Sequence, residues 1–87
     1  MNELHKSNYI KTLSKMKAII VTKENNRIEG KLCMVGDYIV TLDVDKQAID
    51  SQVLTNMYNE GISASEYSNE WHITIARKKV ESIEFVD

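Results

Sequence analysis

The chain has 87 residues, of which 43% are hydrophobic and 28% charged, and its formal net charge is −2. This length fits one domain, and the composition is typical of a soluble globular protein. The single cysteine excludes an internal disulfide framework and indicates a cytoplasmic or redox-indifferent protein. Residues 1–17 contain no unbroken apolar stretch, so we expect neither a signal peptide nor a membrane span.

Charge is unevenly distributed along the chain. Residues 1–23 contain five lysines and one acid, a balance of +4, whereas residues 24–70 contain three bases and nine acids, a balance of −6. The overall acidity argues against a general nucleic-acid binder. A local basic face still attracts phosphates, because salt screens each charge beyond about 10 Å. The same distribution also fits a solvated helix face followed by an acidic surface segment.

In chain order, the first predicted element is a helix over residues 3–16, capped by Asn2 and apolar on one side. A short β-branched strand follows over residues 18–22. The paired asparagines Asn25 and Asn26 then predict a tight hairpin turn that needs positive φ.

The clearest pattern is RIEGKLCMVGDYIVTL, residues 27–42, in which apolar and polar residues alternate on both sides of Gly36-Asp37. Alternation with a period of two predicts two antiparallel strands joined by a hairpin turn. Gly30 in mid-strand predicts a sharp bend. The side chains expected to face inward are Ile28, Gly30, Leu32, Met34, Tyr38, Val40, Leu42 and Val44.

The segment over residues 46–70 reads as an insertion. Its first part, residues 46–60, has apolar side chains at helical spacing and a stop signal at Gly61, so it predicts a helix. Residues 62–70, ISASEYSNE, predict a loop. The remaining predicted elements are two strands joined by a basic turn, over residues 71–76, 80–86 and 77–79.

Together these elements predict a mainly β single domain over residues 1–87. Its architecture is an N-terminal helix and five bent antiparallel strands closed into a small SH3-like barrel, with the helical insertion between strands 3 and 4. Closure is expected because it removes exposed strand edges. A core of this size is marginal, and the terminal strands over residues 71–76 and 80–86 have few charged gatekeepers between Trp71 and Ala76. We therefore expect a homo-oligomer built by edge pairing.

Two motifs in this order resemble those of the Sm-like family, which includes the bacterial RNA chaperone Hfq. The first motif has a glycine in a bent strand, apolar residues and a turn aromatic, and the second surrounds a basic turn. The family's turn aspartate is Gly36 here, with Asp37 one position later. The matching residues are Gly30, Leu32, Val35 and Tyr38 in the first motif and Ile75, residues 76–79, Val80 and Ile83 in the second.

The resemblance implies subunits that associate edge to edge into a ring and bind single-stranded RNA without enzymatic activity. The residues assigned to RNA binding are Tyr38, Asp37, Arg77 and Lys78. Tyr38 would stack on a base, while Arg77 and Lys78 would hold phosphates or base edges. Alternatively, Tyr38 closes the end of the barrel and the basic residues form a solvated turn.

A second possible function is protein binding rather than RNA binding. In it, the chain is a small acidic barrel that binds a basic protein partner, as proteins of phages and mobile elements do when they modulate nucleic-acid enzymes. The candidate anchors are the aromatic residues Tyr58, Tyr67 and Trp71, which flank the predicted loop. Alternatively, Trp71 packs the insertion onto the barrel.

We expect no catalytic, metal or cofactor site. His5 and His72 are far apart in the sequence, and Cys33 has no neighbouring ligand, so no zinc motif is recognised. The three glycines are isolated and form no phosphate-binding loop. No serine or cysteine lies in a nucleophile motif.

Overall fold

The computed structural model describes residues 16–86. The predicted helix over residues 3–16 lies outside the described residues, except for Met16, which begins the first strand. No helix in the described part of the chain is long and apolar enough to cross a membrane. The elements in chain order are β1 (Met16–Thr22), β2 (Arg27–Val35), β3 (Ile39–Asp45), the 3-10 turn η1 (Lys46–Ala48), α2 (Ser51–Asn59), β4 (Ser63–Tyr67), β5 (Glu70–Ala76), the 3-10 turn η2 (Arg77–Lys79) and β6 (Val80–Phe85).

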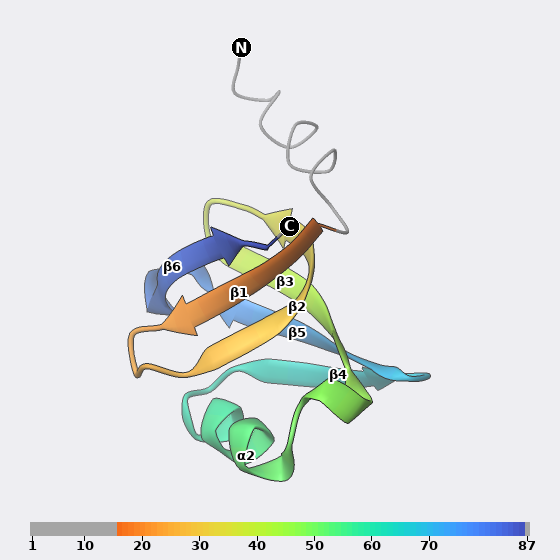
Figure 1. Cartoon of the computed structure of the whole chain (residues 1–87). Helices are drawn as coiled ribbons and strands as arrows, with labels where there is room; N and C mark the ends of the chain where they lie inside the picture. The colour runs from red at the N-terminus through yellow and green to blue at the C-terminus, as the bar shows by residue number, and fades with distance from the viewer. Residues whose placement is uncertain (1–15, 87) are drawn as a thin grey trace.

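All six strands belong to one antiparallel sheet with the order β4-β5-β3-β2-β1-β6 (Figure 1). The prediction of a closed five-stranded barrel is therefore wrong. Within the described residues, β4 pairs with β5 alone and β6 with β1 alone, so the sheet is open. The sixth strand, β4, comes from the segment expected to be a loop. All five of its side chains are exposed, so it lacks the alternating apolar pattern that marks a half-buried strand in a sequence.

The open sheet is strongly curved. β5 and β6 are separated by three strands in the sheet, yet the three residues of η2 join them in the chain. So short a link requires the two halves of the sheet to bend toward each other, and Figure 1 shows β1 and β6 passing over β3 and β5. Two backbone hydrogen bonds fix η2 in place, from Arg77 N to Tyr38 O at 2.8 Å and from Lys23 N to Lys79 O at 2.9 Å.

The β2–β3 hairpin is confirmed, with one change of phase. A β-bulge lies between Leu32 and Met34, which places Met34 opposite Thr41 and Val35 opposite Val40. Met34 is consequently 36% exposed, and Val35 packs against the core instead. The predicted inward position of Met34 is wrong because the bulge adds one residue to a pattern with a period of two.

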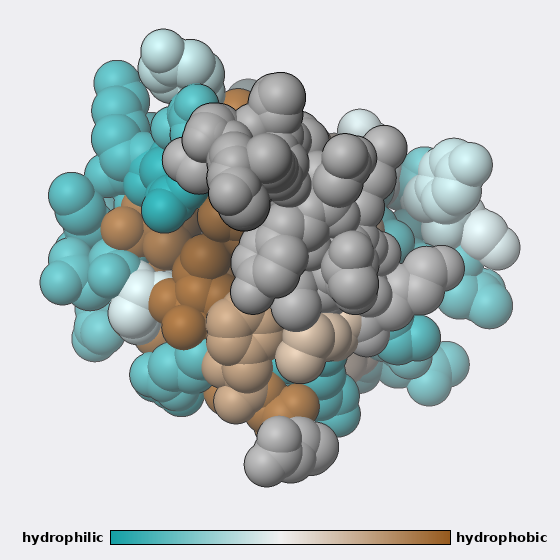
Figure 2. Space-filling model, turned by 90° about the horizontal axis from the view of Figure 1, so that it is seen from above, coloured by the Kyte–Doolittle hydropathy of each residue, from teal (hydrophilic) through white to brown (hydrophobic). Residues whose placement is uncertain are grey.

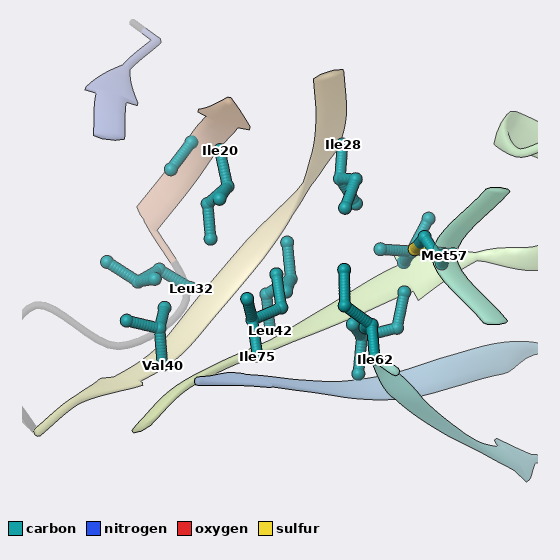
Figure 3. Close-up of a cluster of buried hydrophobic side chains, with 11 residues drawn as sticks. Ile20, Ile28, Leu32, Val40, Leu42, Met57, Ile62 and Ile75 are labelled. Atoms are coloured by element: carbon teal, nitrogen blue, oxygen red, sulfur yellow. The ribbon is translucent and has the colours of Figure 1, made fainter. Parts of the chain in front are cut away.

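The insertion contributes directly to the core. Met57 of α2 and Ile62 just before β4 are 1% and 5% exposed, and Figure 3 shows both side chains beside those of the strands. The helix is shorter than predicted: it begins after Asp50, whose carboxylate accepts from Val53 N at 3.0 Å. Its stop at Gly61, with φ of +79°, is as predicted. The buried core comprises Ala18, Ile20, Ile28, Leu32, Val40, Leu42, Val44, Met57, Ile62, Ile73 and Ile75.

Candidate functional site

The ends of four strands meet on one side of the molecule. The start of β1 lies beside the ends of β2 and β6, and the end of β2 lies beside the start of β3. Figure 2 views the molecule from above and shows hydrophobic residues gathered on this face. We call this region the apolar end; its exposed large hydrophobic residues are Met16, Met34, Tyr38, Ile39 and Phe85.

Tyr38 projects from the turn between β2 and β3. Its exposure of 85% is the highest among the large hydrophobic residues of the described chain. The turn is closed by a hydrogen bond from Gly36 N to Ile39 O at 2.8 Å, and Tyr38 O accepts from Arg77 N. The ring therefore lies outside the core on a backbone that is held at several points, and it does not fill the end of the sheet.

Arg77, although distant in the sequence, contacts the same turn. Its Nη1 donates to the carbonyl oxygen of Gly36 at 2.7 Å, in addition to the backbone bond to Tyr38. A guanidinium has five N–H donors, so this contact leaves others for a ligand. Asp37 is exposed in the same turn and adds one negative charge. The structure thus brings three of the four predicted RNA-binding residues together.

Lys78, the fourth predicted residue, belongs to a neighbouring recess. Glu60 makes two hydrogen bonds at this recess. The Glu60 carboxylate accepts from the Asn26 side-chain amide, and the Glu60 backbone carbonyl accepts from Lys79 Nζ. These bonds tie the β1–β2 turn, the end of α2 and η2 to one another. Lys78 is exposed at this recess, whose lining consists of Lys23, Glu24, Asn59, Glu60, Lys78 and Lys79.

The three aromatic residues predicted to bind a protein do not form one surface. Tyr58 on α2 is 81% exposed and Tyr67 at the end of β4 is 73% exposed. Trp71 is partly buried against the core, and Lys46 Nζ lies 5.5 Å from the centroid of its ring. Trp71 pairs with Glu66 of β4. Because neighbouring strand residues point to opposite faces, Tyr67 and Trp71 lie on opposite sides of the sheet.

The structure also brings together three residues that the sequence did not associate. Nδ1 of His72 lies 2.7 Å from Oδ1 of Asp43, and potential ligand atoms of Cys33, Asp43 and His72 all lie within 4.8 Å of one another. Cys33 has no neighbouring ligand in the sequence, but in the structure it lies close to Asp43 and His72. The neighbours come from two other strands, and their meeting depends on the β3–β5 register, which no local sequence pattern reveals.

Comparisons of the chain with protein-family models, curated proteins and solved structures find no match. The resemblance to the Sm-like family rests on the motif residues quoted above.

Proposed function

We propose that the chain is a non-enzymatic module that binds single-stranded RNA at its apolar end. The observation that carries this proposal is the 85% exposure of Tyr38 on a turn held by both the backbone and the side chain of Arg77. An exposed aromatic ring beside a cation is a common surface for single-stranded nucleic acid, since any base can stack on the ring. Stacking contributes about 1–3 kcal/mol per base.

Further positively charged side chains lie next to Arg77 in the chain and at the neighbouring recess. Lys78 follows Arg77 and is exposed, and Lys23 lines the same recess as Lys78. In this proposal, phosphates next to the base that stacks on Tyr38 would contact these charges. The remaining donors of Arg77 would contact a phosphate or a base edge.

We also propose that the chain forms a homo-oligomer and that it is cytoplasmic. The association would use the edges of β4 and β6, because each has one partner strand within the described chain. The predicted edge at residues 71–76 is not available, since β5 lies between β3 and β4. Several copies of one weak site on a single RNA would raise the overall affinity.

Binding of a basic protein, such as a nucleic-acid enzyme, is the second candidate function. Exposed methionine, isoleucine and phenylalanine side chains at the apolar end favour it, because exposed apolar side chains can anchor a protein partner. The insertion over residues 46–70 adds four acids against one lysine. These charges complement a basic partner.

The direct test is fluorescence anisotropy with short labelled RNA oligonucleotides of each base type at low salt. We expect saturable binding that weakens as salt increases. Arg77→Ala should flatten the slope of log affinity against log salt by about 0.7 for each phosphate that the variant no longer neutralises. Lys31→Ala removes an exposed cation on β2 and serves as the matched control, with an unchanged slope. Absence of binding by the wild-type chain would contradict the proposal and favour a protein partner.

A further inference from the structure

A β-bulge places the single cysteine of the chain beside two other potential metal ligands. Lys31 of β2 pairs with Asp43 and Leu32 pairs with Leu42, but the next pair joins Met34 to Thr41, which leaves Cys33 as the extra residue. Bulges re-aim the side chain of such a residue. Cys33 consequently lies beside Asp43 of β3 rather than opposite Thr41.

Asp43 and His72 reach the same place by direct strand pairing. They are partners in the β3–β5 register, so their side chains share the face of the sheet opposite the core. Nδ1 of His72 and Oδ1 of Asp43 are 2.7 Å apart, and both side chains are partly exposed, at 43% and 33%. The site is thus formed by three neighbouring strands and open to ions from solvent.

The three ligand atoms are a sulfur, an imidazole nitrogen and a carboxylate oxygen, all within 4.8 Å of one another. Zn²⁺ binds these donors at about 2.0–2.3 Å in a tetrahedron, which corresponds to ligand atoms roughly 3.3–3.8 Å apart. Binding would require His72 Nδ1 and Asp43 Oδ1, now 2.7 Å apart, to separate by rotation of their side chains. We propose that Cys33, Asp43 and His72 bind Zn²⁺ or a chemically similar divalent ion, with the fourth position open to water or an external ligand.

The surrounding charge favours a cation. A shallow groove beside Asp43 is lined by four acidic residues and two lysines, the acids being Glu29, Asp43, Asp45 and Glu70. Across the sheet, the direct neighbours of the Asp43–His72 pair are Lys31 on one side and Ser65 on the other. Lys31 is exposed, so its ammonium group can turn away into solvent when an ion binds.

Titration of the full, metal-free chain with Co²⁺ tests this site, because cobalt reports its ligands by absorption. We expect one ion per chain and a near-ultraviolet charge-transfer band from thiolate to cobalt, with Zn²⁺ displacing the cobalt. Cys33→Ser and His72→Gln should each lower affinity by more than the roughly 10–100-fold that follows loss of an outer-shell partner. Zn²⁺ should raise the Tm of the wild-type chain and not that of Cys33→Ser.

Two matched variants distinguish this site from adventitious binding. His5→Gln removes the other histidine of the chain and should retain the charge-transfer band and the affinity. Asp45→Asn removes an acid of the same groove that is not a proposed ligand, so it should retain the band and lower the affinity far less than Cys33→Ser does. Circular dichroism of each metal-free variant checks that the fold is kept. Absence of saturable binding, a missing thiolate band, or binding that survives Cys33→Ser but is lost in His5→Gln would each overturn the proposal.

Discussion

The guanidinium of Arg77 donates a hydrogen bond of 2.7 Å from Nη1 to the carbonyl oxygen of Gly36, 41 positions earlier in the chain. The backbone of Arg77 also donates to Tyr38 O. Together these bonds connect η2 to the β2–β3 turn. They determine where the Tyr38 ring stands relative to the Arg77 charge, so the candidate site depends on the pairing of the neighbouring strands β3 and β5, which these bonds extend.

Arg77→Ala should lower the free energy of unfolding by about 0.5–1.5 kcal/mol, the typical net contribution of one hydrogen bond. The backbone bond to Tyr38 remains in this variant, so the fold should be kept. Urea unfolding followed by circular dichroism measures the change. Lys78→Ala, an exposed neighbour without this contact, is the control and should be close to neutral. Equal losses in the two variants would show that the Gly36 contact has no specific role.

Met57→Ala should destabilise the chain by about 2–5 kcal/mol, because it removes a buried side chain and leaves a cavity. Met57 is 1% exposed, whereas its neighbour Tyr58 is 81% exposed. Tyr58→Ala is therefore the matched control on the same helix and should change stability by no more than about 0.5 kcal/mol. Chemical denaturation of both variants gives the comparison.

Replacement of residues 47–68 by a short turn should unfold the chain, because this segment contains Met57, Ile62 and β4. If the segment were a surface insertion, as the sequence predicts, its deletion would leave the domain folded, since closing a loop of this length costs little entropy. The burial of Met57 and Ile62 argues against this outcome. A deletion variant with native circular dichroism and cooperative unfolding would restore the prediction of a surface insertion.

Gly30→Ala should also destabilise the fold, by about 1–3 kcal/mol, through overpacking. A Cβ at position 30 would lie 2.4 Å from the carbonyl oxygen of Asp43 and 2.9 Å from Cγ2 of Val44. At Gly36 the nearest atom to such a Cβ is Ile39 O at 3.3 Å, so Gly36→Ala should cost less. Thermal unfolding of the two variants ranks them, and the reverse order would contradict the close approach of β2 and β3.

Sequence patterns predicted the central hairpin because one face of β2 and β3 is buried. Val40, Leu42 and Val44 follow the period of two that this burial imposes. The same reasoning fails at β4, where no face is buried and the sequence SASEY carries no alternation. It also fails at Met34, because a bulge shifts the phase without a local sequence signal.

The candidate site was predictable in part. Tyr38, Asp37 and Arg77 follow from the turn and the motif resemblance, and the structure places them together. The meeting of Cys33 with His72 was not predictable, because it depends on a bulge in β2 and on the pairing of β3 with β5. Such contacts are set by register between strands distant in sequence, and single-sequence periodicity carries no information on register.

Self-association through strand edges should appear as a mass above that of the monomer, rising with concentration, in light scattering. Phe85 lies on the edge strand β6 and is 50% exposed, so Phe85→Lys should weaken association by adding a charge to that edge. Glu81→Ala, an exposed position on the same strand, is the control. A wild-type chain that stays monomeric at all concentrations would contradict edge pairing.

The most direct test of the proposed function compares RNA binding by Tyr38→Ala and Tyr58→Ala. Both tyrosines are almost equally exposed, at 85% and 81%, but only Tyr38 belongs to the apolar end beside Arg77. Fluorescence anisotropy with single-stranded RNA at low salt should show Tyr38→Ala weakened by about 1–3 kcal/mol with an unchanged salt slope, because stacking releases no counterions. Tyr58→Ala should bind as the wild type does. Equal affinity of Tyr38→Ala and the wild type, with both folded, would contradict the stacking role of Tyr38.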